Sequence, residues 1–153
     1  MEINHNILVS SGAIAAIKEE LAKWNTEQLL EIQIKNTSGG ISGEVSYMRN
    51  KITNNFENFY MKLRVQVNMP VQIVTLYGFG WIKFNSIDEK VIQVFAHELH
   101  HYLFKTGQIA DPDTEWNCTA SSIKFLSEFT GKPVESYISE VNVCHMKRMR
   151  MIS

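Results

Sequence analysis

The sequence His97-Glu98-Leu99-His100-His101 lies within residues 87–105, where apolar residues recur at helical spacing. Residues four positions apart lie one turn apart on the same face of a helix. His97 and His101 can therefore each direct a ring nitrogen toward one metal ion. Glu98 is rotated by about 100° from His97, so its carboxylate lies beside such an ion rather than on it. The stretch predicts a two-histidine metal site with an adjacent carboxylate.

Both ends of the helix that carries this motif can be read from the sequence. Ser86-Ile87-Asp88-Glu89 has the S-x-x-E pattern of a capping box. Asp88 and Glu89 add negative charge to the first turn, which stabilises a helix N-terminus. Gly107 follows the last apolar residues and can end the helix. The sequence therefore predicts a helix over residues 87–105.

The chain before this helix begins with a helix and continues in strands. Apolar spacing over residues 11–24 predicts an amphipathic helix, with Ser10 or Ser11 as its N-cap. Strict alternation of apolar and charged residues predicts a strand over 30–35. The serines and glycines at 38–43 predict a loop.

Residues 44–59 fit two structures. Their apolar spacing fits a helix, whereas Thr53-Asn54-Asn55 fits a turn between two strands, and we favour strand–turn–strand. Alternating and β-branched residues predict further strands over 63–69, 71–77 and 81–85. The last two of these strands are expected to form a hairpin around Gly78-Phe79-Gly80.

Turn residues follow the motif helix at Asp111-Pro112-Asp113-Thr114, with Asp113 or Thr114 as the next N-cap. Helices are predicted over 115–129 and 133–149, the second with Pro133 in its first turn. Residues 1–153 are thus predicted to form a single α+β domain. A small mixed or antiparallel sheet packs against an N-terminal helix and the motif helix, and two C-terminal helices follow.

The composition predicts an ordinary folded protein. The 153 residues are 44% hydrophobic and 20% charged, which allows a buried core without disulfides or other cross-links. The net charge of -1 gives no general attraction to nucleic acid or to an anionic membrane. A basic cluster at 147–150 is expected to be a solvated helix end.

The predicted location is the cytoplasm. The N-terminus lacks the charged flank and apolar core of a signal peptide, and no apolar run is long enough to cross a bilayer. Cys118 and Cys144 form no C-x-x-C pair. Either thiol can in principle bind a metal, but both are expected to be free and to pack in the core.

A catalytic zinc ion held by two histidines needs a third protein ligand and keeps a position for water. No histidine follows His101 until His145, so a carboxylate on the next helix is the expected third ligand. Glu115, at the start of that helix, is the first choice. Asp111, Asp113 and His145 are the alternatives.

Three segments resemble the ImmA/IrrE family of zinc metallopeptidases, and the chain is also similar to other minimal gluzincin-like peptidases. The segments are Trp81-Ile82-Lys83-Phe84-Asn85, Phe95-Ala96-His97-Glu98-Leu99-His100-His101 and Glu115-Trp116-Asn117-Cys118-Thr119-Ala120. The resemblance covers residues 81–126. Asn85 and Asn117 match recurring positions of the family's pattern, whereas the segment between His101 and Glu115 is shorter than is usual in it.

The resemblance implies a zincin-like fold in which His97, His101 and Glu115 hold one catalytic zinc ion and Glu98 is the general base. It implies an endopeptidase rather than an exopeptidase, acting on a protein or peptide, with a transcriptional repressor as one possible substrate. The competing hypothesis is a zinc-binding interaction or sensing module with little proteolytic turnover. The sequence predicts neither the substrate nor the oligomeric state.

Other side chains have less specific roles at this level. His100 is expected on the exposed far side of the motif helix, or else as a residue that orients a ligand. The strand around 77–84 is expected to offer an edge to an extended substrate. The candidate donors to an oxyanion are Tyr77, Tyr102, Tyr137 and His145.

Overall fold

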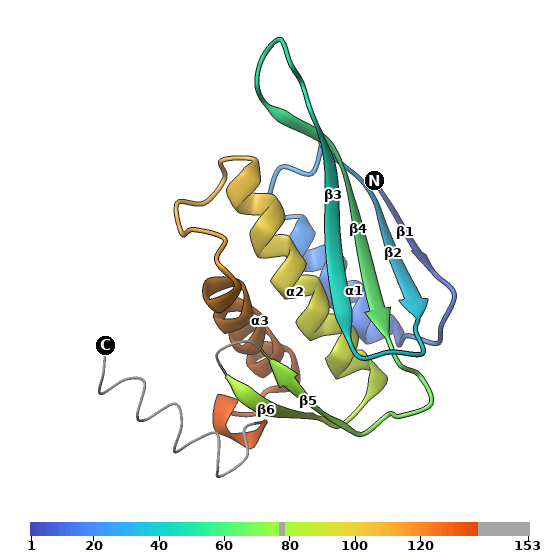
Figure 1. The fold of residues 1–153 in the computed structure, drawn as a ribbon. Helices are drawn as coiled ribbons and strands as arrows, with labels where there is room; N and C mark the ends of the chain where they lie inside the picture. Colours follow the sequence, from blue (N-terminus) through green and yellow to red (C-terminus); the bar gives the residue numbers. More distant parts are fainter. Residues whose placement is uncertain (77–78, 138–153) are drawn as a thin grey trace, which may run out of the picture.

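The computed structural model describes residues 1–76 and 79–137, which form a mixed sheet, a separate hairpin and three α-helices (Figure 1). The sheet has four strands in the order β1-β2-β4-β3, namely β1 (Glu2–His5), β2 (Leu29–Asn36), β4 (Phe56–Val65) and β3 (Ser42–Arg49). β1 and β2 are parallel, as are β2 and β4, whereas β3 runs antiparallel to β4. β3 therefore forms one edge of this sheet.

The helices cover one face of the sheet because alternate residues of its strands are apolar. In β4, Phe59, Met61, Leu63 and Val65 are buried, whereas Tyr60 on the other face is exposed. Two helices pack over the buried face, α1 (Ser11–Leu21) and α2 (Ile87–Lys105). The predicted α+β class, with an N-terminal helix and the motif helix against a small mixed sheet, is confirmed.

The motif helix α2 has the predicted bounds and lies at the centre of the molecule. The capping box forms as expected, because Ser86 Oγ accepts a hydrogen bond from the Glu89 amide at 3.1 Å and Glu89 Oε2 accepts one from the Asn85 amide at 3.2 Å. Gly107 follows the helix with φ 74°, a conformation that favours glycine. On its other side α2 packs against α3 (Glu115–Thr130), which Thr114 caps.

The predicted hairpin forms between β5 (Gln72–Leu76) and β6 (Gly80–Phe84). It lies near the N-terminal end of α2 (Figure 1). Buried Lys90 of α2 fixes the segment between β4 and the hairpin. Its Nζ donates to the Gln66 carbonyl at 2.9 Å, to the Met69 carbonyl and to Gln72 Oε1 at 2.6 Å.

Strand–turn–strand is confirmed for the ambiguous region, as β3 and β4 with positive φ at Asn54 near the turn. The separate strand predicted over 63–69 is wrong. A single strand ends at Val65, since Lys90 captures the carbonyls that follow. The first strand, β1, was not predicted.

Helix α1 ends at Leu21, and Ser10 rather than Ser11 is its cap. The helix predicted over 133–149 begins as a 3-10 turn, Val134–Ser136. Its remainder falls largely outside the described residues, together with Cys144, His145 and the basic cluster at 147–150. Within the described part of the chain, no helix has the length and apolar character that a membrane span requires.

Candidate metal site

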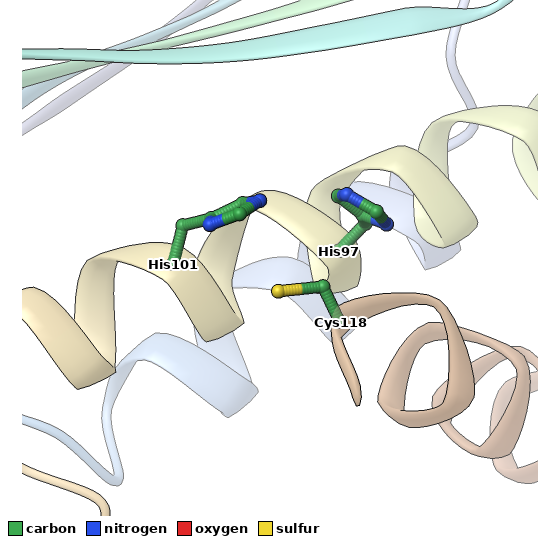
Figure 2. Close-up of side chains that lie close together, drawn as sticks. All are labelled: His97, His101 and Cys118. Carbon is green, nitrogen blue, oxygen red and sulfur yellow. The ribbon is translucent and has the colours of Figure 1, made fainter. Parts of the chain in front are cut away.

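The two motif histidines face the same space beside α2. Their ring centroids are 5.3 Å apart, and both side chains are mostly buried. Figure 2 shows both rings rising from one side of the helix, with Cys118 reaching toward α2 from the first turn of α3. The i, i+4 spacing thus gives the shared face that the sequence predicts.

Glu115 reaches both histidines. Its Oε2 lies 3.2 Å from His97 Nε2, and its Oε1 lies 3.3 Å from His101 Nε2. Thr114 makes this possible by capping α3, because its Oγ1 accepts the Asn117 amide at 3.1 Å and so starts the helix at Glu115. The short segment after His101 is therefore long enough to return a carboxylate to the two rings.

Cys118 is a second group near the histidines. His97, His101 and Cys118 form a cluster that could hold a metal ion, with one ligand atom of each within 4.8 Å of the others. The thiol is fully buried, as expected, and burial raises its pKa to about 12. The Glu115 carboxylate also suits a ligand, because it lies within hydrogen-bonding distance of both Nε2 atoms and lines the cleft beside them.

The two aspartates weighed as alternative ligands lie elsewhere. Asp113 Oδ2 is 3.0 Å from His101 Nδ1, the opposite ring nitrogen from the one that faces Glu115. Asp111 Oδ2 is 3.4 Å from His100 Nε2, and its Oδ1 accepts a hydrogen bond from Asn117 Nδ2 at 3.3 Å. The structure therefore brings neither aspartate to the Nε2 pair.

Glu98 is buried beside the histidines and against β3. Burial raises its pKa to about 7, and Glu115 and Glu44 act in the same direction while His101 opposes them. Burial also lowers the pKa of His97, which favours the neutral ring that a metal requires. The site thus combines a neutral ring at His97 with a carboxyl group, Glu98, whose pKa is about 7.

A cleft of about 630 Å³ opens over these residues. β3 and α2 form its main walls, and the end of β5 and the start of α3 contribute the rest. The sequence placed the edge strand for substrate around 77–84. Instead, residues 41–45 of the edge strand β3 and its lead-in line the cleft beside Glu98.

The exposed position predicted for His100 is wrong. Its ring is buried, with Nδ1 2.9 Å from Ser121 Oγ and Nε2 3.2 Å from the Asp111 carbonyl. The side of α2 that seemed free in the sequence is covered by α3 and by the loop before it. His100 therefore links α2 to α3 and to the loop before α3, through Ser121 and the Asp111 carbonyl.

The two predicted oxyanion donors that lie within the described residues, Tyr102 and Tyr137, hydrogen-bond to groups outside the cleft. The Tyr102 hydroxyl donates to the Asn25 carbonyl at 2.9 Å, and the buried Tyr137 hydroxyl pairs with Thr130 Oγ1. Neither tyrosine lines the cleft. Tyr77 and His145 lie outside the described residues.

Comparisons of this chain with protein-family models, with curated proteins and with solved structures gave no match. The functional assignment therefore rests on the site itself. Two imidazoles and a carboxylate, beside a cleft that admits water, are the donor set of a catalytic zinc ion, so His97, His101 and Glu115 fit that metal.

Proposed function

We propose that this chain is a zinc-dependent metallopeptidase with a zincin-like site similar to that of the ImmA/IrrE family. His97, His101 and Glu115 hold one zinc ion, and Glu98 is the general base. The observation that carries the proposal is the Glu115 carboxylate, which reaches both Nε2 atoms at 3.2 and 3.3 Å. A carboxylate from a separate helix, placed within reach of both rings, is a feature that a chance H-E-x-x-H sequence does not require.

Each residue has a distinct part in peptide hydrolysis. When bound, zinc would supply Lewis acidity, activating a water molecule and polarising the peptide carbonyl. Glu98 takes a proton from the attacking water and delivers it to the leaving amine. Burial raises the pKa of Glu98 above the usual value of a carboxyl group, which makes its carboxylate a better proton acceptor for the first of these steps.

The edge strand β3 supports a protein or peptide as the substrate. An extended peptide can add to a free strand edge through main-chain hydrogen bonds, and residues 42–45 of β3 lie along the cleft. Binding through main-chain hydrogen bonds along a strand does not require a chain terminus of the substrate, which supports an endopeptidase. The resemblance to the ImmA/IrrE family suggests a transcriptional repressor as this substrate.

The position of Glu98 favours catalysis over a zinc-dependent binding or sensing module. A metal site that only stabilises structure has no need for a carboxyl group beside its open side. Keeping Glu98 buried is also unfavourable for its charged form, as its raised pKa shows. An unfavourable placement of this kind is typical of a residue used in chemistry.

The test is the variant Glu98→Gln, with Glu19→Gln as its control. Glu19 is an exposed residue of α1 and does not line the cleft. A substrate is first selected from a peptide library by mass spectrometry. Glu98→Gln should bind zinc as the wild type does and lose hydrolysis by about 100-fold or more, while Glu19→Gln stays active. Normal hydrolysis by Glu98→Gln would contradict the mechanism.

A further inference from the structure

We infer that Asp113 is a positioning residue that orients His101 toward the zinc ion, and that Lys105 anchors Asp113 in this role. The inference rests on the proposed function, since it concerns the same metal. It assigns Asp113 a task different from the ligand role considered for it in the sequence.

The contacts of the His101 ring carry the inference. Asp113 Oδ2 lies 3.0 Å from Nδ1, while Glu115 Oε1 lies 3.3 Å from Nε2 on the opposite side. A ring that binds metal through Nε2 keeps its proton on Nδ1, and a carboxylate there accepts that proton in a charge-assisted hydrogen bond. Asp113 therefore selects both the tautomer and the direction of the ring.

Lys105 holds Asp113 from the other side. Its Nζ lies 3.6 Å from Asp113 Oδ2. The same ammonium lies over the Tyr47 ring at 5.0 Å and the Phe56 ring at 5.5 Å, both within the range of cation–π contacts. Because Lys105 follows His101 by one helical turn, it projects from the same face of α2. Tyr47 thus links the edge strand β3 to the orientation of a metal-facing ring.

His97 differs from His101 in this respect. Its Nδ1 lies 3.3 Å from Thr119 Oγ1, a neutral hydroxyl that can either donate or accept. Such a partner fixes the ring less firmly than a carboxylate does. The orientation of His101 is therefore fixed more firmly than that of His97. The segment at the start of α3 that supplies Asp113 also supplies Glu115.

Asp111 offers a matched control within the same loop. Like Asp113, it places a carboxylate near a histidine ring, at 3.4 Å from His100 Nε2. His100, however, is directed toward Ser121 and not toward the Nε2 pair. A general effect of removing an acidic residue from this loop should therefore appear in both variants, and a positioning effect only in the Asp113 variants.

The experiment measures zinc affinity by competition with a chromophoric chelator for the wild type, Asp113→Ala, Asp113→Asn and Asp111→Ala. Asp113→Ala should weaken zinc binding by about 10- to 100-fold, Asp113→Asn less, and Asp111→Ala hardly at all. NMR of the zinc-loaded protein adds a readout of orientation. The His101 Nδ1 proton should be protected from exchange in the wild type and lose that protection in Asp113→Ala.

The possible outcomes separate this inference from the proposed function. Unchanged zinc affinity together with a protected ring proton in Asp113→Ala would overturn the inference and leave the metallopeptidase proposal standing. A wild type that binds no zinc would overturn both. If Asp113→Ala fails to fold, Asp113→Asn decides, because it keeps the shape of the side chain but removes the negative charge of the hydrogen bond to His101 Nδ1. Zinc affinity equal to that of the wild type in Asp113→Asn would then overturn the inference.

Discussion

Gly43 of β3 lies directly against Glu98 of α2, so that a Cβ added at position 43 would stand 2.5 Å from both Cγ and Oε1 of Glu98. Real Cβ atoms do not approach other heavy atoms so closely. The absence of a side chain at Gly43 therefore lets the edge strand approach the motif helix and leaves Glu98 its place beside the histidines.

This relationship makes Gly43→Ala a test of where Glu98 must be. The added methyl group should push the carboxyl group away, lowering hydrolysis by about 100-fold, as a displacement of about 1 Å in a catalytic group can, with zinc binding retained. The matched control is Gly40→Ala, where an added Cβ meets nothing within 4 Å. Full activity in Gly43→Ala would show that hydrolysis does not depend on this position of Glu98.

The identity of the third ligand can be decided by comparing Glu115→Gln with Cys118→Ala. Removing a residue that only hydrogen-bonds to a ligand typically lowers metal affinity by about 10- to 100-fold. If Glu115 is itself a ligand, Glu115→Gln should lower zinc affinity by more than this. Cys118→Ala should keep nearly all of its zinc affinity. Chelator competition on both proteins gives the values, and the reverse order would assign the metal to the thiol.

The buried Lys90 should contribute strongly to stability. Its ammonium is fully buried and donates to two carbonyls and the Gln72 amide oxygen, so Lys90→Met leaves these acceptors without a donor. We expect the free energy of unfolding in urea to fall by about 3 kcal/mol. Lys18→Met, at an exposed position of α1, serves as the control and should change little. Equal effects of the two substitutions would contradict the buried hydrogen-bond network.

The thiol of Cys118 should be unreactive in the folded protein. It has no exposed surface, and burial raises its pKa to about 12, so the reactive thiolate is scarce at pH 8. In metal-free Cys144→Ser protein, iodoacetamide should label Cys118 only after unfolding in urea, as mass spectrometry would show. Rapid labelling without urea would mean that the packing of α3 against α2 does not bury this residue.

Local signals in the sequence were sufficient to predict the motif helix and the position of Glu115 at the start of the next helix. Ser86 and Gly107 mark the ends of α2 through capping chemistry that needs no tertiary contact. The i, i+4 spacing likewise needs no tertiary contact, because it places His97 and His101 on the same face of α2. The reach of Glu115 could be predicted because Thr114 begins the next helix one residue before it.

The features that sequence reasoning missed depend on packing between distant segments. Ser42 and Gly43 read as part of a loop, and no local pattern shows that this glycine meets Glu98 across the cleft. His100 seemed exposed because the helix alone does not show that α3 covers its far side. The closeness of Asp113 to the motif in the sequence made it a candidate ligand. Only the structure shows that its carboxylate lies next to Nδ1 of His101.

A crystal structure of the zinc-loaded protein, with the metal located by its anomalous scattering, tests the central claim most directly. The proposal predicts one zinc ion at about 2.0–2.2 Å from His97 Nε2, His101 Nε2 and a Glu115 carboxylate oxygen, with its remaining position open to the cleft beside Glu98. Zinc bound to the Cys118 sulfur in place of Glu115, or no zinc at the two histidines, would contradict it.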